Sequence, residues 1–497
     1  MPMTSLAAPR TQPRPAFAWP KSSVLTALIL TLAAFALRWP HFGDPAYHVD
    51  EEFYLLVGDR ILHGALPYVD IWDRKPVGLF LIYAAARAVG GDGVLSYQLL
   101  ATGCAAATAG TIARIARHRA SEPAAIWAGI AYLVWIETVE GGGGQAPVFY
   151  NLPMALAAAL VMEAGAVRDL RLWRRHAFIA MVLAGVAIQI KYSAVVEACF
   201  FGLALSWQRT RHGPAASALS EIALLALVAL APTLVVFAIY AALGHGGAFW
   251  FANFVSIFLR APTDPAELQR RLGTFLVQLV PLTICFATGI AWTLRDRDRR
   301  ARGWALFMLG WTGAALAGCA IVGEFYPHYL LPLFVPLAIG SAAAFRPRPL
   351  GLTLAGLLVW LPFHHLDYPD FAATSRSKAE IANLAALVPP EVTNGCMLMF
   401  DGPPVLYLRT HACTLSRFVF PDHLSAAMEN GAIGVDPVAE LRRVLAQHPI
   451  AIITSTVQVR APNLRTYRVL NAVLRRDYRL AGSSPVAGRK IDVWVRR

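Results

Sequence analysis

Charged residues are scarce in this chain of 497 residues. Only 15% of them are charged, whereas a soluble domain has roughly 25%. Hydrophobic residues make up 57% of the sequence, and the mean hydropathy is +0.49. This composition excludes a soluble globular protein. It predicts a polytopic membrane protein, because so much apolar sequence leaves room for many membrane-spanning helices.

Several motifs are also missing. No CxxC or HExxH spacing is present, which argues against a zinc ribbon or a zinc protease. No internal repeat is visible, although many transporters are built from duplicated halves. No small-residue cleavage site follows the first apolar segment, so we expect an uncleaved first span rather than a signal peptide.

Cysteine is rare, with six residues in the chain. Four of them lie inside apolar segments, where a thiol is usually an inert core residue. Cys396 and Cys413 lie in the polar C-terminal region. If that region is outside the cytoplasm, they could form a disulfide, and two free thiols are the alternative.

Positive charge is in excess, and the formal net charge is +13. The arginines fall in short clusters between apolar segments, which follows the positive-inside rule and argues against nucleic-acid binding. Between these clusters we predict eleven membrane-spanning helices, at residues 22–39, 95–113, 123–139, 149–167, 176–190, 193–208, 217–243, 272–294, 303–322, 328–345 and 349–366.

The segment Pro76–Val89 is apolar but short, and it carries Arg87. Such a segment is typical of an interfacial or re-entrant helix. If it does not cross, a cytoplasmic N-terminus places every basic cluster on the cytoplasmic side. The sequence then predicts a cytoplasmic tail at 1–21, a membrane domain at 22–366 with a long outer loop at 40–94, and an extracytoplasmic region at 367–497.

The region from about residue 367 is more polar. Strand-like runs at Cys396–Phe400, Ile450–Thr456 and Ile491–Val495 alternate with helical patterns at Lys378–Leu387, Val438–Gln447 and Leu464–Arg475. Strands that alternate with helices indicate a small α/β domain.

Three consecutive acids, Asp50, Glu51 and Glu52, follow the first apolar segment. Carboxylates beside a bilayer are costly unless they face water, a partner or a substrate. They are either a general base with binding groups or a solvated helix N-terminus whose acids favour the helix dipole. The acids begin a longer ordered pattern, Asp50-Glu51-x-x-Tyr54, then Leu62-x-Gly64-x-x-Pro67-Tyr68, then Asp70-x-x-Asp73-x-Lys75-Pro76.

This pattern resembles the first periplasmic loop of GT-C glycosyltransferases. The most similar groups are bacterial relatives of dolichyl-phosphate-mannose–protein mannosyltransferases and of the aminoarabinose and galacturonic acid transferases that modify lipopolysaccharide. In that family the loop carries the catalytic Asp and ends in Lys-Pro-Pro, where Val77 replaces the second proline here. The resemblance implies an all-α membrane domain in a cell inner membrane, membrane-parallel helices in the loop, and a periplasmic α/β domain.

The resemblance also implies roles for the residues of the loop. Asp50 would be the general base on an acceptor hydroxyl, and Glu51 would orient the acceptor or ligate a divalent cation if one is used. Lys75 would meet a lipid phosphate as a compact positive charge. Lys191, in a tight turn between two spans, is a second phosphate contact or a snorkelling lysine. Glu52 is expected to be a solvated third acid.

Further binding candidates are Tyr54, Glu324, His328 and Tyr329. The last three belong to Glu324-Phe325-Tyr326-Pro327-His328-Tyr329, which resembles a Phe-Tyr-x-His-Tyr segment of the family. His328 and Tyr329 could bind the phosphate or the sugar, although Tyr329 also fits an aromatic belt.

Two other outer loops remain less specific. Glu137 and Glu140 precede the run Gly141–Gly144, which we expect to be a flexible loop without an assigned role. The segment 244–271 is either a mobile interfacial flap with Arg260 or an ordinary interfacial helix.

The expected function is inverting sugar transfer from a polyprenyl-phosphate donor to a glycolipid, polysaccharide or protein acceptor, with no required cofactor. Two other functions compete with it, a transporter or flippase of lipid-linked substrates and a non-catalytic accessory subunit of a glycosylation complex. Transporters usually place ionisable groups near the membrane midplane, whereas the groups named above lie on one face. An accessory subunit would have lost the acid, but Asp50 is present.

Overall fold

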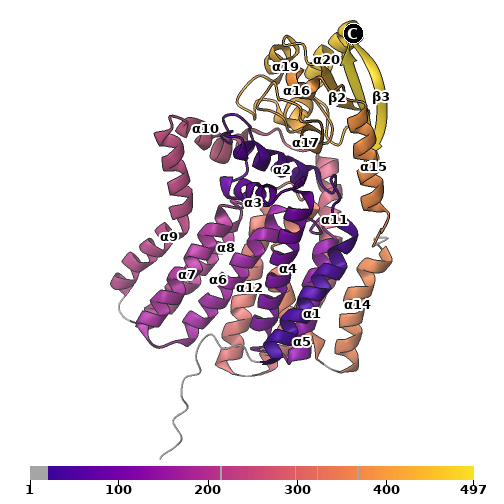
Figure 1. The fold of residues 1–497 in the computed structure, drawn as a ribbon. Helices are drawn as coiled ribbons and strands as arrows, with labels where there is room; N and C mark the ends of the chain where they lie inside the picture. The colour runs from indigo at the N-terminus through magenta and orange to yellow at the C-terminus, as the bar shows by residue number, and fades with distance from the viewer. Residues whose placement is uncertain (1–20, 213–214, 297, 322, 347, 366–368) are drawn as a thin grey trace, which may run out of the picture.

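The structure, a computed structural model, describes residues 21–212, 215–296, 298–321, 323–346, 348–365 and 369–497. It is a mostly helical membrane protein with a small C-terminal mixed sheet. Long helices form a bundle, two shorter helices lie across one end of it, and the sheet lies beyond them (Figure 1). Most of the predicted tail at 1–21 and the predicted boundary at 366–367 lie outside the described residues.

Six helices of the described part are long and apolar enough to cross a membrane. They are α1 (Lys21–Arg38), α4 (Val94–Ala116), α6 (Ala146–Ala166), α9 (Ala215–Ala242), α11 (Pro265–Arg295) and α12 (Arg299–Ala320). The other predicted spans coincide with shorter helices, α5 (Glu122–Glu137), α7 (Leu170–Ile188), α8 (Ala194–Arg209), α13 (Phe334–Ser341) and α14 (Pro349–His365). The count of eleven crossing helices stays a prediction.

The tenth predicted span, 328–345, is not one continuous helix. It consists of a 3₁₀ turn at Pro327–Leu330, the buried helix α13 and a second 3₁₀ turn at Ala342–Phe345. Pro332 lies in the break between the first turn and α13. A proline has no backbone N–H to donate and its ring crowds the preceding turn, so a continuous helix is unfavourable there.

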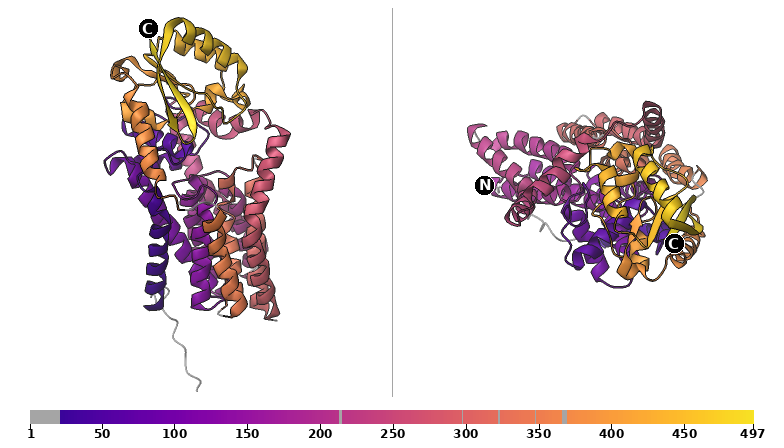
Figure 2. Two further views of the ribbon diagram at one scale, coloured as in Figure 1. Left: turned by 90° about the vertical axis from the view of Figure 1, so that its right-hand side faces the viewer. Right: turned by 90° about the horizontal axis from the view of Figure 1, so that it is seen from above.

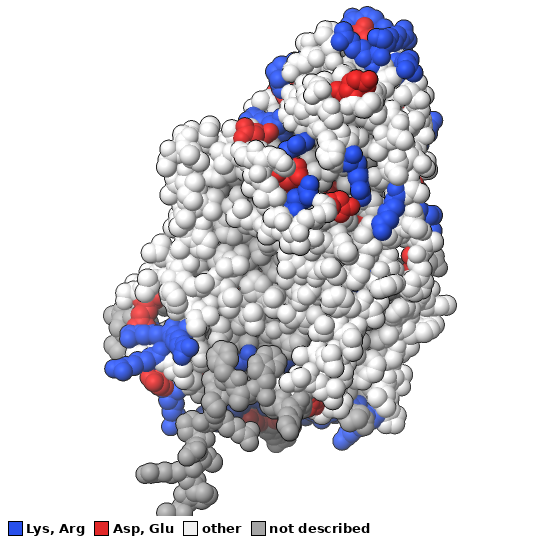
Figure 3. Space-filling model, viewed as in Figure 1, with Lys and Arg blue, Asp and Glu red and all other residues white. Residues whose placement is uncertain are grey.

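The distribution of charge agrees with a membrane environment. Lys, Arg, Asp and Glu gather at the two ends of the bundle, and the middle of the visible face is free of them (Figure 3). On α1, large apolar side chains such as Leu25 and Leu32 are about 60% exposed (59% and 60%). Such exposure is unfavourable in water but costs nothing against lipid chains.

The outer loop forms α2 (Val49–Leu62) and α3 (Val77–Ala88), which lie across the end of the bundle (Figure 1). α3 has only 12 residues, which is too short to cross a bilayer. Arg87 near its end donates a hydrogen bond to Asp59 of α2 at 2.9 Å. This crosswise arrangement agrees with the interfacial helix that the sequence predicts.

The C-terminal region contains a four-stranded sheet in the order β1-β2-β4-β3. The strands are β1 (Met397–Met399), β2 (Ala451–Ser455), β3 (Tyr478–Val486) and β4 (Arg489–Arg496). β1 pairs with β2 in parallel, and the other two pairs are antiparallel. The sequence predicts every strand except β3, an edge strand with a bulge between Leu480 and Gly482, whose Arg, Gly, Ser and Pro residues hide any alternation.

The helices of this region are α15 (Ala373–Ala386), α16 (Val392–Gly395), α17 (Val405–Thr410), α18 (Asp422–Ser425), α19 (Pro437–Leu445) and α20 (Leu464–Asp477). α15, α19 and α20 match the helical patterns of the sequence. Seen from above, the region covers only part of the bundle and leaves the side of α7 to α9 uncovered (Figure 2).

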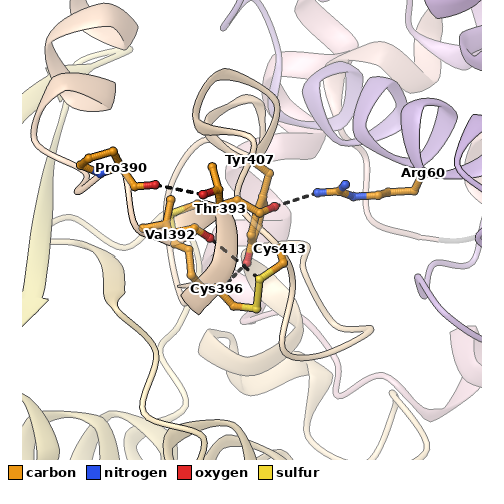
Figure 4. Close-up of a disulfide and its surroundings, with 9 residues drawn as sticks. Arg60, Pro390, Val392, Thr393, Cys396, Tyr407 and Cys413 are labelled. Carbon is orange, nitrogen blue, oxygen red and sulfur yellow. Dashed lines mark hydrogen bonds between the residues drawn. A yellow bond between two sulfur atoms is a disulfide. The ribbon is translucent and has the colours of Figure 1, made fainter.

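A disulfide joins Cys396 and Cys413 in this region (Figure 4). Arg60 of α2 donates a hydrogen bond at 2.9 Å to the carbonyl oxygen of Ala412, the residue before Cys413. The crosslinked turn is therefore attached to the outer loop.

We predict that this crosslink is detectable chemically. In the unreduced, denatured full-length protein, a thiol reagent should label the four free cysteines, Cys104, Cys199, Cys285 and Cys319, but neither Cys396 nor Cys413. Reduction should add two labels, counted by mass spectrometry. Six labels before reduction would contradict the disulfide.

Candidate active site

The acidic triplet lies on the first turn of α2. His48 caps this helix, because its Nδ1 accepts the backbone N–H of Asp50 at 3.1 Å. Acids at this position are favourable since the helix N-terminus carries partial positive charge. The three side chains then diverge, so that Asp50 is half-buried while Glu51 and Glu52 are buried.

Glu52 faces the C-terminal region. Its Oε2 accepts the backbone N–H of Val405 at 3.2 Å, and only 5% of the residue is exposed. The prediction of a solvated third acid is therefore wrong. The sequence could not reveal this contact, because Val405 lies 353 residues away.

Glu51 faces the glycine segment Gly141–Gly144 and is fully buried. Its carboxylate leaves no space at Gly143, where a Cβ atom would overlap both carboxylate oxygens. Burial raises the pKa of Glu51 to about 7, although His48, the Gly144 backbone and Tyr97 oppose this. The structure thus places Glu51 behind Asp50, under the glycine segment.

The glycine segment is a fixed support. Its four residues are buried. The fully buried Arg38 at the end of α1 donates to the carbonyl oxygens of Gly141 and, at 3.2 Å, of Gly143. Its Nε also lies 3.2 Å from a carboxylate oxygen of Glu137. The prediction of a flexible loop is wrong, because glycine here serves close packing of buried charged groups.

This support carries Glu140 into the site. Glu140 has a φ of +62°, a conformation that non-glycine residues rarely adopt and that is often found at functional sites. Its Oε2 lies 2.7 Å from Nδ1 of His328 and 3.3 Å from Nε2 of His48. Three segments that are far apart in sequence thus meet at one carboxylate.

These three residues are the one set of potential metal ligands of this kind in the described part of the chain, with ligand atoms within 4.8 Å of one another. Nδ1 of His48 accepts the N–H of Asp50, which leaves Nε2 to donate to Glu140. Burial lowers the pKa of His48, but the hydrogen bond to Glu140 and the charges of the surrounding acids outweigh burial and raise it to about 9. Glu140 thus joins His48 and His328 in one hydrogen-bonded chain.

Lys75 and Lys191 lie near each other beside Asp50. Nζ of Lys75 lies 5.5 Å from the ring centroid of Tyr54, and Nζ of Lys191 lies 4.4 Å from that of Tyr329. Among the described residues neither lysine has a carboxylate within ion-pair distance. Burial, and next the charge of Lys75, lower the pKa of Lys191 to about 8. Two ammonium groups that lie near each other without such partners attract anions.

The carboxylate of Asp50 is likewise without an ion-pair partner among the described residues. Burial favours its neutral form, but the positive charges around it outweigh burial and lower the pKa to about 2. Those charges are Lys75, His48, His328 and Arg460. Asp50 is therefore ionised at neutral pH.

The remaining predicted residues have different surroundings. Tyr54 is buried, and its hydroxyl has no hydrogen-bond partner among the described residues. Tyr329 packs edge-on against His328, with ring centroids 5.0 Å apart. Glu324 is already bound, since it accepts from Thr263 at 2.7 Å and pairs with Arg271 at 3.1 Å. The structure thus brings together Asp50, Lys75, Lys191, His328 and the two tyrosines. Glu324 lies close enough for its charge to act on Tyr329, but it is already paired with Arg271.

The C-terminal region adds a residue that the sequence analysis missed. Arg460 contacts Asp422 and the hydroxyl of Tyr326, and its charge acts on Asp50. Nearby, the fully buried Glu429 pairs with Arg74 of the outer loop and with Arg260. No motif surrounds Arg460 in the sequence, so no local signal could have found it.

Comparisons with solved structures show a likeness over nearly the whole chain. ArnT from Cupriavidus metallidurans matches with a TM-score of 0.63 and 14% identity, over 95% of this chain and 97% of that chain. The same values hold for the ArnT structure bound to undecaprenyl phosphate. This chain has a fold like that of ArnT. In the sequence, the resemblance is clearest around Asp50 and His328. The likeness of fold covers both the helical bundle and the C-terminal region.

Other comparisons add little to this likeness. The Archaeoglobus fulgidus oligosaccharyltransferase matches with a TM-score of 0.49 and 10% identity, over 87% of this chain and 69% of that chain, which is too low to support an argument. No family model matches the chain, and no curated protein matches it. The roles of individual residues therefore depend on the geometry of this site.

The glycine support leads to a testable prediction. Gly143→Ala should lower the stability by about 1–3 kcal/mol, because the added methyl group would overlap the buried carboxylate of Glu51. Gly103→Ala on α4 is the matched control, since a Cβ there meets nothing within 4 Å. Thermal unfolding of both purified variants measures the difference. Equal melting temperatures for Gly143→Ala and the wild type would show that the segment can yield.

Proposed function

We propose that the protein transfers a sugar from a polyprenyl-phosphate donor to a hydroxyl group of a glycolipid, polysaccharide or protein. One observation carries this proposal. Within the described part of the chain, Lys75 and Lys191 have no carboxylate at ion-pair distance, and they lie near Asp50, which has no ion-pair partner there either. A lipid phosphate supplies the negative charge that these lysines lack, and its sugar then lies close to Asp50. The ArnT structure with bound undecaprenyl phosphate supports this choice of donor.

In the proposed reaction Asp50 accepts the hydrogen bond of the acceptor hydroxyl and draws off its proton. The hydroxyl oxygen bonds to the anomeric carbon while the bond from that carbon to the phosphate oxygen breaks. The departing phosphate keeps the electron pair, and the two ammonium groups stabilise its growing charge. A single direct displacement inverts the anomeric centre. Because the lysines supply the positive charge, the reaction requires no metal ion.

The surrounding side chains support the same arrangement. Tyr54 and Tyr329 lie under the two ammonium groups, where an aromatic face stabilises a cation without neutralising it. Glu51 is a positioning residue in this proposal, because it is buried behind Asp50. The site thus keeps a net attraction for an anion while its shape is fixed.

The proposal places the site on the outer face of a cell inner membrane. All eleven predicted spans would cross, with the tail at 1–21 in the cytoplasm and the region 367–497 in the periplasm. The arginine clusters at the opposite end of the bundle support this orientation. The disulfide supports it too, because disulfides persist in oxidising compartments.

The donor site can be tested with lysine variants. Lys75→Met and Lys191→Met should each slow transfer on the order of 10²–10³-fold, as expected when a group that stabilises developing charge is removed. Lys490→Met is the control, since this side chain is 60% exposed on the C-terminal sheet. The assay uses the full-length protein in nanodiscs with radiolabelled undecaprenyl-phosphate mannose, aminoarabinose or galacturonic acid and a cell-envelope extract as acceptor. No transfer by the wild type, together with movement of donor across liposomes, would favour a transporter.

Removal of Asp50 and of metal ions gives a second prediction. Asp50→Asn should slow transfer on the order of 10²–10⁴-fold, whereas EDTA should leave the wild-type rate unchanged. Loss of activity in EDTA that returns with a divalent cation would contradict the role given to the lysines. Equal turnover by Asp50→Asn and the wild type would exclude Asp50 as the base.

A further inference from the structure

A groove lies between α8 and α9 at the end of the bundle opposite the candidate active site. α8 begins at Ala194, next to the turn that carries Lys191, and ends at Arg209 at the far end, where α9 begins. The groove has a volume of about 330 Å³. Small-molecule sites in proteins occupy about 300–1,000 Å³, so the groove has the size of a binding site.

The walls of the groove are one stripe of each helix. Along α8 and its C-cap the lining residues recur every three or four positions, which places them on one face. They are Leu203, Ser206, Trp207 and Thr210, and Ala218 and Leu219 line the groove from α9. The hydroxyls of Ser206 and Thr210 donate to carbonyl oxygens of α8. The walls therefore present mainly apolar surface, which suits an acyl chain.

Trp207 indicates the depth of the groove in the membrane. It lies near the end of α8 and is 70% exposed, and tryptophan is enriched at the membrane–water interface. Arg211, just beyond α8, is exposed and has no ion-pair partner among the described residues. One mouth of the groove therefore lies at the level of the lipid head groups, and Leu203 lies one turn deeper.

Positive charge is in excess at this mouth. Arg174 of α7 and Arg209 of α8 share the carboxylate of Glu221 on α9, with Nε of Arg209 at 2.7 Å from Oε2. Thr210 and Ile222, which both line the groove, directly follow Arg209 and Glu221 in the chain. Two guanidinium groups with one shared carboxylate therefore lie beside the groove.

Basic residues outnumber acids at the ends of these three helices. The segments 168–176 and 209–222 carry six arginines and two acids. Charged side chains gather at the lower left of Figure 3, where Figure 1 shows the ends of α7 and α9. The positive-inside rule accounts for arginines at this end of the bundle, but not for their position around an apolar groove. That combination is complementary to a lipid with an anionic head group.

Close packing of α9 on α7 fixes one wall of the groove. A Cβ atom at Gly185 of α7 would lie 2.7 Å from the carbonyl oxygen of Ala229 on α9. One turn further along, Gln189 donates a hydrogen bond to Thr233 at 2.6 Å. Near the start of α9, Glu221 binds both α7 and α8. The groove is therefore bounded by helices whose positions are set by contacts outside it.

We propose that this groove binds an anionic phospholipid from the membrane leaflet at this end of the bundle. An acyl chain lies against Leu203 and Leu219, and the head-group phosphate meets the positive charge of Arg174, Arg209 and Arg211. Basic pockets between membrane helices commonly bind anionic head groups. A zwitterionic lipid carries its own cation beside the phosphate, so it binds more weakly. The site is at the opposite end from Asp50 and does not depend on sugar transfer.

Native mass spectrometry tests this lipid site. The full-length protein in detergent is mixed with cardiolipin, phosphatidylglycerol or phosphatidylcholine, and the dissociation constant of the tightest-bound lipid is measured. The wild type should bind the two anionic lipids about tenfold more tightly than phosphatidylcholine. Arg174→Gln and Arg211→Gln should each weaken binding of the anionic lipids about fivefold. Ser206→Phe leaves the charge unchanged but fills the groove, so tight binding should be lost.

Two variants on α12 are matched controls. Arg300→Gln removes an exposed arginine at the same end of the bundle, and Leu309→Phe enlarges a side chain that is 45% exposed. Both should bind lipid as the wild type does. Thermal unfolding without added lipid shows that each variant is folded.

Three results would overturn the lipid site. Equal affinity of the wild type for all three lipids would mean that the groove holds only bulk lipid. An equal loss in Arg300→Gln and Arg211→Gln would mean that the basic end attracts anionic lipids without a defined site. Unchanged binding in folded Arg174→Gln, Arg211→Gln and Ser206→Phe would place the bound lipid elsewhere. None of these results bears on the proposed sugar transfer, which the lysine and Asp50 variants test separately.

Discussion

A buried arginine supports the whole outer end of this molecule. Arg38 at the end of α1 pairs with Glu137 and donates to two carbonyl oxygens of the glycine segment. That segment packs on Glu51 and carries Glu140, so the backbone of the candidate site is fixed from below. Unpaired buried charge is costly. The contacts of Arg38 and the geometry of the site therefore depend on each other.

Some charged residues around the candidate site form ion pairs, and others do not. Glu324, Glu429 and Asp422 each have an arginine partner, and these pairs connect the outer loop, the segment 244–271 and the C-terminal region. By contrast, Asp50, Lys75 and Lys191 have none among the described residues. The charged groups that connect segments are thus paired with each other. The charged groups at the candidate site have no such partner and are available to a substrate. A donor phosphate and an acceptor hydroxyl fit this unfilled set.

The sequence predicts the parts of this arrangement that depend on local pattern. Apolar length and arginine clusters predict the helices of the bundle. The pattern from Asp50 to Pro76 predicts the outer loop and, through its resemblance to a known family, the fold. The sequence misses what depends on contacts between distant segments. The sequence predicts a solvated Glu52, but its carboxylate accepts the N–H of Val405. It predicts a flexible segment at Gly141–Gly144, but Arg38 binds its carbonyl oxygens. No sequence motif surrounds Arg460. β3 is missed because it is an irregular edge strand that needs β4 as its partner.

The position of Arg38 has a consequence for biogenesis. The ribosome makes this guanidinium before its partners, and Gly141 follows 103 residues later. A lone arginine is unfavourable in hydrocarbon, so the end of α1 has to stay at the interface until α4 and α5 are inserted. An N-terminal fragment that stops before Glu137 would present an unpaired charge to membrane quality control.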